Sequence, residues 1–115
     1  MSAPIVFFDI AGPNIEKLHD FYSTVFGWKM DEKYQFTVEA ISPIHAALRR
    51  DPQEKRIYIG VTDVAESLSM IETNGGVVDT PRFEVPGVVV LGLFKDPAGN
   101  EMGLVEMDGE KHKIP

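Results

Sequence analysis

Three polar side chains in this sequence are of the types that bind divalent iron or manganese. Asp9, His45 and Glu101 offer two carboxylates and one imidazole, a ligand set that suits these ions. Side-chain alternation along strands would place Asp9 on the same face as Phe7, and Glu101 on the same face as Gly103. A metal site at these residues is one hypothesis, and the competing one is that they meet only water or an organic ligand.

Other kinds of catalytic chemistry find no support in the sequence. The chain has no cysteine, which excludes disulfides, thiolate metal sites and a cysteine nucleophile. It also has neither a Gly-x-Ser-x-Gly nucleophile elbow nor a glycine-rich phosphate loop before a helix. No catalytic residue is therefore assigned, and the sequence leaves open whether the protein is an enzyme.

Size and charge limit the class of protein and its partners. A chain of 115 residues with 43% hydrophobic residues is long enough for one domain with a single core. With 18 acidic against 11 basic residues its net charge is −7, which disfavours a nucleic-acid partner. The N-terminus lacks a basic region and an export-length apolar run, and no segment reaches membrane-spanning length. We expect a cytoplasmic protein with no membrane partner.

The elements that must position these residues follow one pattern twice. An apolar β-branched run, Ile5 to Ala11, is followed by a helix pattern that starts after Asn14 and stops at Gly27. Up to three short antiparallel strands come next. The order then restarts with a strand, and the spacing of Asp63 and Glu66 predicts a capped second helix. Three further strands are predicted at 76–80, 87–94 and 101–107.

A shift of 49 positions superimposes the two patterns, from Asn14 on Asp63 to Gly27 on Gly76. The sequence therefore predicts an α+β fold of two βαβββ modules, at about 4–51 and 55–107, followed by a loose tail at 108–115. Each module would cover one face of a curved sheet with its helix and leave the other face to line a cleft. The aromatic residues at the end of the first helix are expected to pack in the core. They are Phe21, Tyr22, Phe26 and Trp28.

Three segments resemble the vicinal oxygen chelate superfamily, which includes glyoxalases, extradiol dioxygenases and bleomycin resistance proteins. They are DFYSTVFGWKM, VTDVAESLSMIETNGGVV and FKDPAGNEMGLVE, and the similarity runs from about Ile5 to Glu106. The resemblance implies an open, mixed eight-stranded sheet, a homodimer and a ligand cleft on the concave side. It also implies where a metal would bind in the metal-dependent members, on cleft-facing positions of four strands.

Those positions hold residues that do not bind a metal in the ordinary way. The first falls on Phe7, the second on Arg56 and the last on Gly103, while the remaining one falls near Ala47. Gly103 would then mark a vacated ligand position facing the cleft, with its two chain neighbours pointing into the core. A glycine that merely accommodates a bend of the sheet is compatible with this interpretation.

The favoured hypothesis is a protein that binds a small molecule in the cleft without a metal or other cofactor. Phe7, Tyr58 and Val105 would supply apolar contacts beside the vacated position at Gly103, and His45 would add an imidazole. Asp9 and Glu101 would supply hydrogen-bond acceptors and Arg56 a fixed cation for an anionic ligand.

Three alternatives stay open. In the first, Arg56 pairs with Asp9 or Glu101 and no ligand is involved. In the second, the protein is a metal-dependent lyase, isomerase or dioxygenase that uses a shifted site at Asp9, His45 and Glu101. In the third, it is an interaction module whose cleft is filled by its own side chains.

Overall fold

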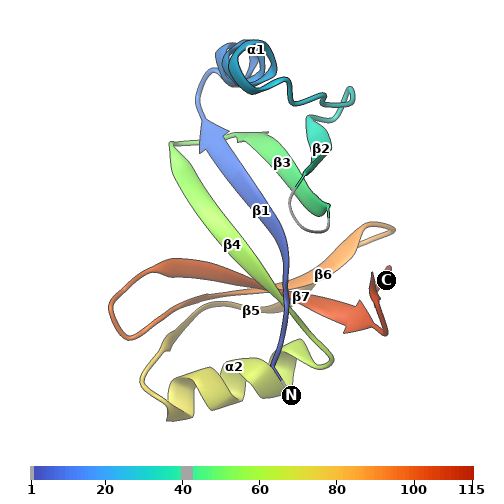
Figure 1. Ribbon diagram of the computed structural model, residues 1–115. Coiled ribbons are helices and arrows are strands. Elements are labelled where there is room, and N and C mark those ends of the chain that lie inside the picture. Colours follow the sequence, from blue (N-terminus) through green and yellow to red (C-terminus); the bar gives the residue numbers. More distant parts are fainter. Residues whose placement is uncertain (1, 40–42) are drawn as a thin grey trace. The chain divides into compact units, whose positions relative to one another are not determined.

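The computed structural model describes residues 2–39 and 43–115 (Figure 1). Contacts divide the chain into two compact units: the N-terminal unit, Phe7–Ile57, and the C-terminal unit, Tyr58–Pro115 together with the residues before Phe7. The elements are β1 (Ile5–Gly12), α1 (Ile15–Phe26), β2 (Gln35–Val38), β3 (Ile44–Arg50), β4 (Glu54–Val61), α2 (Val64–Thr73), β5 (Val77–Val85), β6 (Val89–Lys95), β7 (Glu101–Asp108) and β8 (Lys111–His112).

The N-terminal unit is a three-stranded arrangement covered by α1. β3 pairs in parallel with β1 and antiparallel with β2. Asn14 caps α1 by accepting a hydrogen bond from the Lys17 N–H (3.1 Å), and Gly27 ends the helix in the left-handed conformation with φ 71°. Its core consists of Ile15, Phe36, Ala46 and Leu48. After α1 the described part of this unit has two strands before β4, which agrees with the expectation of up to three, and residues 40–42 lie outside the description.

The aromatic residues of α1 are less buried than the sequence predicts. Tyr22 stacks on Trp28 with ring centroids 5.0 Å apart, and both pack against the core. Phe21 and Phe26, however, are 54% and 58% exposed. The expectation of core positions was therefore wrong for these two, because α1 turns them away from β3 and toward solvent.

The C-terminal unit contains β7 at its centre, parallel to β4 and antiparallel to β6, with β5 pairing beyond β6. The Asp63 side chain accepts from the Glu66 N–H (2.9 Å), as the capping spacing predicts for the start of α2. The tail expected to be loose is tied down in part: β8 pairs with β7, and the Lys113 N–H donates to the Glu106 carbonyl (2.8 Å). The core of this unit consists of Val64, Leu68, Phe94 and Leu104.

Over the described residues the fold is thus the expected α+β fold, with two βαβββ-like units and eight strands in an open, mixed sheet. None of the described helices is both long enough and apolar enough to cross a bilayer.

Candidate functional site

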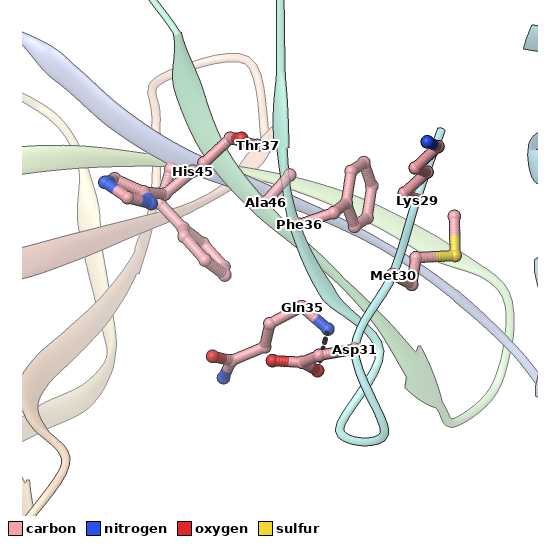
Figure 2. Close-up of a pocket in the computed structure, with 9 residues that line it drawn as sticks. Lys29, Met30, Asp31, Gln35, Phe36, Thr37, His45 and Ala46 are labelled. Atoms are coloured by element: carbon pink, nitrogen blue, oxygen red, sulfur yellow. Dashed lines mark hydrogen bonds between the residues drawn. The ribbon is translucent and has the colours of Figure 1, made fainter. Parts of the chain in front are cut away.

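A groove of about 490 Å³ lies in the N-terminal unit, beside β2 (Figure 2). Its walls come from β1, β2, β3 and the segment that follows α1. The residues that line it are Phe7, Lys29, Met30, Asp31, Gln35, Phe36, Thr37, His45 and Ala46. Two of the residues expected at the site, Phe7 and His45, are therefore brought together here.

Strand register explains why Phe7, His45 and Thr37 meet. Phe7 on β1 is the direct neighbour of His45 on β3, and His45 is the direct neighbour of Thr37 on β2. Phe36 and Ala46, the adjacent residues on their strands, belong to the core beneath α1. Because side chains alternate along a strand, the row of Phe7, His45 and Thr37 lies on the opposite face, away from α1. This is the face that the sequence assigned to the cleft.

The segment after α1 forms the other wall of the groove. The Asp31 carboxylate accepts hydrogen bonds from the Lys33 N–H (2.8 Å) and the Gln35 N–H (3.0 Å), so it fixes a turn. Lys29 is exposed and makes no ion pair within the described part of the chain, which leaves an ammonium group available to a ligand. Sequence reasoning did not identify Lys29 or Thr37 as groove residues. They line the same groove only because the turn at Asp31 brings the segment after α1 next to β2.

Asp9 and Arg56 lie outside this groove in a network of ion pairs within the N-terminal unit. Asp9 is 3% exposed and pairs with Arg49, whose Nε lies 2.9 Å from Oδ2. Arg49 also pairs with Asp51 (2.8 Å) and with Glu54 (2.7 Å). Glu54 in turn pairs with Arg56 at 2.5 Å. Burial raises the pKa of Glu54, but the hydrogen bonds from Arg49 and Arg56 outweigh it and hold that pKa below its ordinary value.

Within this network Arg56 pairs with Glu54. Its expected pairing with Asp9, with Glu101 or with an anionic ligand stays a prediction. The guanidinium of Arg49 occupies the Asp9 carboxylate, which is therefore not a free metal ligand. Arg49 stands next to Arg50 in the sequence, and no local pattern identifies it as the partner of Asp9.

Gly103 has a packing reason to be glycine. It is buried on β7 beside Tyr58 of β4, its direct neighbour in the parallel register. A Cβ at position 103 would lie 2.4 Å from Cδ2 and 2.6 Å from Cε2 of the Tyr58 ring. Met102 and Leu104 pack on the α2 side, as predicted, so residue 103 faces away from that core. The space of the expected vacated ligand is therefore filled by an aromatic ring.

The Gly103→Ala variant should lower the free energy of unfolding by about 1–3 kcal/mol, because the added methyl group overpacks the ring of Tyr58. Urea unfolding of this variant, of Tyr58→Ala and of the double variant measures the coupling. In the double variant the methyl group has room, so its cost should largely disappear. Equal costs of the methyl group with and without the Tyr58 ring would contradict this account of Gly103.

Glu101 is exposed at the start of β7, in the C-terminal unit. Over residues 2–39 and 43–115, no group of three His, Asp or Glu side chains is arranged to hold a metal ion. The shifted set of Asp9, His45 and Glu101 draws on residues of both units and stays a hypothesis.

The model of the glyoxalase-like domain matches residues 5–105, which is nearly the whole chain. The chain belongs to the glyoxalase-like domain family. The resemblance to the vicinal oxygen chelate superfamily is thereby confirmed.

Solved structures of this family's fold superpose on this glyoxalase-like chain over almost its full length. The hypothetical protein BH1468 from Bacillus halodurans is 14% identical with a TM-score of 0.67, covering 98% of this chain and 100% of its own. A methylmalonyl-CoA epimerase in complex with methylmalonyl-CoA and ammonium is 14% identical with a TM-score of 0.69 and the same coverage. A Streptomyces coelicolor methylmalonyl-CoA epimerase variant with 2-nitronate-propionyl-CoA is 14% identical with a TM-score of 0.67, covering 98% and 99%. At this identity the likeness shows the fold alone, and no curated protein matches the chain.

Proposed function

We propose that this glyoxalase-like protein binds a small organic molecule in the groove beside β2, without the help of a metal. The observation on which this rests is the groove itself, where an aromatic ring, an imidazole and an ammonium group line one hollow of about 490 Å³. Ligand sites typically combine apolar walls with a few polar groups in a volume of this order. Phe7 supplies the apolar contact, and Lys29 and His45 supply the polar groups.

The residues at the metal-ligand positions of the family favour binding without a metal. Phe7 offers a hydrocarbon ring, and Arg56 is a cation that already pairs with Glu54. At Gly103 the ring of Tyr58 takes the space that a ligand side chain would need. None of these three groups has the lone pair that coordinates a divalent ion.

The cation in the groove indicates the class of ligand. Lys29 is exposed beside the hollow, whereas Arg56 is 8% exposed and is held by Glu54. A carboxylate on the ligand would therefore pair with Lys29, while a planar or apolar part would lie on Phe7. The roles of Asp9, Tyr58 and Glu101 as ligand contacts stay predictions, as does the homodimer.

Binding can be tested with a panel of small aromatic carboxylates, screened by the shift in melting temperature and confirmed by calorimetry. The Phe7→Ala and Lys29→Ala variants should each weaken binding about 5- to 10-fold, since each loses one contact worth about 1 kcal/mol. Lys55→Ala is the matched control, because Lys55 is exposed in the same unit but does not line the groove.

Dialysis against a chelator should leave the affinity unchanged. Binding that disappears with the chelator would overturn the proposal in favour of metal-dependent chemistry. A panel without any stabilising compound would overturn it in favour of an interaction module.

A further inference from the structure

The groove beside β2 is an opening in a hairpin whose two arms separate. At its closed end the Asp31 N–H donates to the Gln35 carbonyl (3.0 Å), and the Gln35 N–H donates to the Asp31 carboxylate (3.0 Å). Both backbone groups of Gln35 therefore point away from β3. The carbonyl of Tyr34, the preceding residue, accepts from the Leu48 N–H of β3 (2.9 Å) and so points toward it.

Alternation along β2 determines where the backbone of Thr37 points. In an antiparallel pair, successive residues direct their N–H and C=O groups to opposite sides of the strand. Thr37 is two residues beyond Gln35, so its N–H and C=O also point away from β3. Within the described ranges, 2–39 and 43–115, no hydrogen bond to these two groups is present. They face the groove that Thr37 lines.

The other arm does not close this opening. Lys29 precedes Asp31 by two residues and Thr37 follows Gln35 by two, so the two residues would be paired if the hairpin continued. Lys29, however, lies outside the strands of the described chain. In Figure 2 the segment of Lys29 and Met30 diverges from β2 above the turn at Asp31. The C-terminal unit differs here, because β5 covers the corresponding side of β6.

We propose that this opening binds an N-acylated amino-acid unit, which pairs with Thr37 as an added antiparallel strand would. The N–H of the ligand donates to the Thr37 carbonyl, and its C=O accepts from the Thr37 N–H. This inference rests on the proposed function and names the ligand class for the same groove. It uses two backbone groups at the edge of the sheet for which the described residues provide no partner.

The pairing also fixes where the ligand side chain lies. Residues directly opposite each other in an antiparallel pair place their side chains on the same face. The ligand side chain would therefore share the face of Thr37, His45 and Phe7, which favours an aromatic or aliphatic group. A free carboxylate at the C-terminal end of the ligand would have Lys29 as its cation.

Amide NMR with two probes tests the pairing. N-acetyl-L-phenylalanine methylamide should bind and slow hydrogen exchange at the Thr37 amide. Its analogue methylated on the phenylalanine nitrogen lacks the donor and should bind about 10-fold more weakly, the loss of roughly one hydrogen bond. Equal affinity for the two probes, or no binding of the first, would overturn the inference.

A variant of Thr37 tests its backbone directly. Thr37→Pro removes the N–H and should weaken binding about 10-fold, whereas Lys55→Ala, outside the groove, should bind the probe like the parent protein. If Thr37→Pro fails to fold, the comparison of the two probes on the parent protein still decides. A Thr37 amide already protected from exchange in the free protein would overturn the inference, because the hairpin would then be closed on Lys29.

The outcomes also distinguish this inference from the proposed function. Binding of aromatic carboxylates together with equal affinity for the two probes would refute the amide pairing and retain the groove. Failure of both ligand classes would refute both.

Discussion

Replacing Arg49 with methionine should lower the free energy of unfolding by about 3 kcal/mol, because it removes a guanidinium that pairs with the buried Asp9 carboxylate. Asp9 is 3% exposed, accepts a hydrogen bond from Arg49 Nη2 (3.3 Å) and lies in an ion pair 2.9 Å from Arg49 Nε. Methionine keeps much of the length of the side chain, so most of the loss reports charge and hydrogen bonding rather than packing. Urea unfolding at neutral pH measures the effect.

The neighbouring arginine provides the matched control. Arg50 pairs with Glu16, and both side chains are more than half exposed. Solvent screens such a pair, so Arg50→Met should cost far less than Arg49→Met. Adding Asp9→Asn to Arg49→Met should recover part of the stability, because the buried group is then neutral. Similar losses for the two arginine variants would show that Asp9 does not depend on Arg49.

Local sequence signals predicted the helices and their ends. Asn14 and Asp63 cap the two helices as their spacing indicates, and Gly27 ends the first in the left-handed conformation. These features depend on neighbours within about four residues, so the sequence contains them directly. The direction of Met102 and Leu104 into the core likewise follows from alternation along one strand.

The contacts of the candidate site residues could not be predicted from the pattern of any single strand, because they depend on how strands pair. The collision of a residue at 103 with Tyr58 follows from the register of β4 and β7. Arg49 reaches Asp9 across 40 positions of sequence, and no local pattern distinguishes it from Arg50. The direction of the Thr37 backbone groups, away from β3, leaves no trace in side-chain patterns, since any residue type at an edge presents such groups.

Glu106, which connects β7 to α2, is the second residue whose replacement should lower stability strongly. Its buried carboxylate accepts from Arg82 through Nε (3.0 Å) and Nη2 (2.9 Å), and from the Val64 N–H at the first turn of α2 (3.0 Å). Lys113 of the tail adds a cation 3.4 Å away. The hydrogen bonds from Arg82 are the main cause that lowers the pKa of Glu106 from 4.5 to about 2, against the opposing effect of burial.

The Glu106→Gln variant should lower the free energy of unfolding by about 2 kcal/mol at neutral pH. This loss is smaller than the free energy that corresponds to the full pKa shift, because solvent screens part of the pairing with Arg82. The folded pKa is depressed, so this contribution is complete above pH 4.5 and is lost as the pH falls toward 2. The parent and variant should therefore differ most at pH 7 and converge near pH 2. Unfolding curves at several pH values measure the difference in unfolding free energy between parent and variant. The other carboxylates are present in both proteins, so their titration cancels in this difference.

Glu84→Gln is the control for Glu106, because Glu84 also pairs with Arg82 but lies 52% exposed at 3.4 Å. Its effect on stability at neutral pH should be small. A difference between parent and Glu106→Gln that stays constant from pH 7 to pH 2 would mean that the carboxylate acts by shape rather than by charge. Because Glu106 also accepts from the first turn of α2, the loss should appear locally as faster hydrogen exchange at Val64. The groove of the N-terminal unit contains none of these residues, so ligand binding there should persist in Glu106→Gln wherever the variant remains folded.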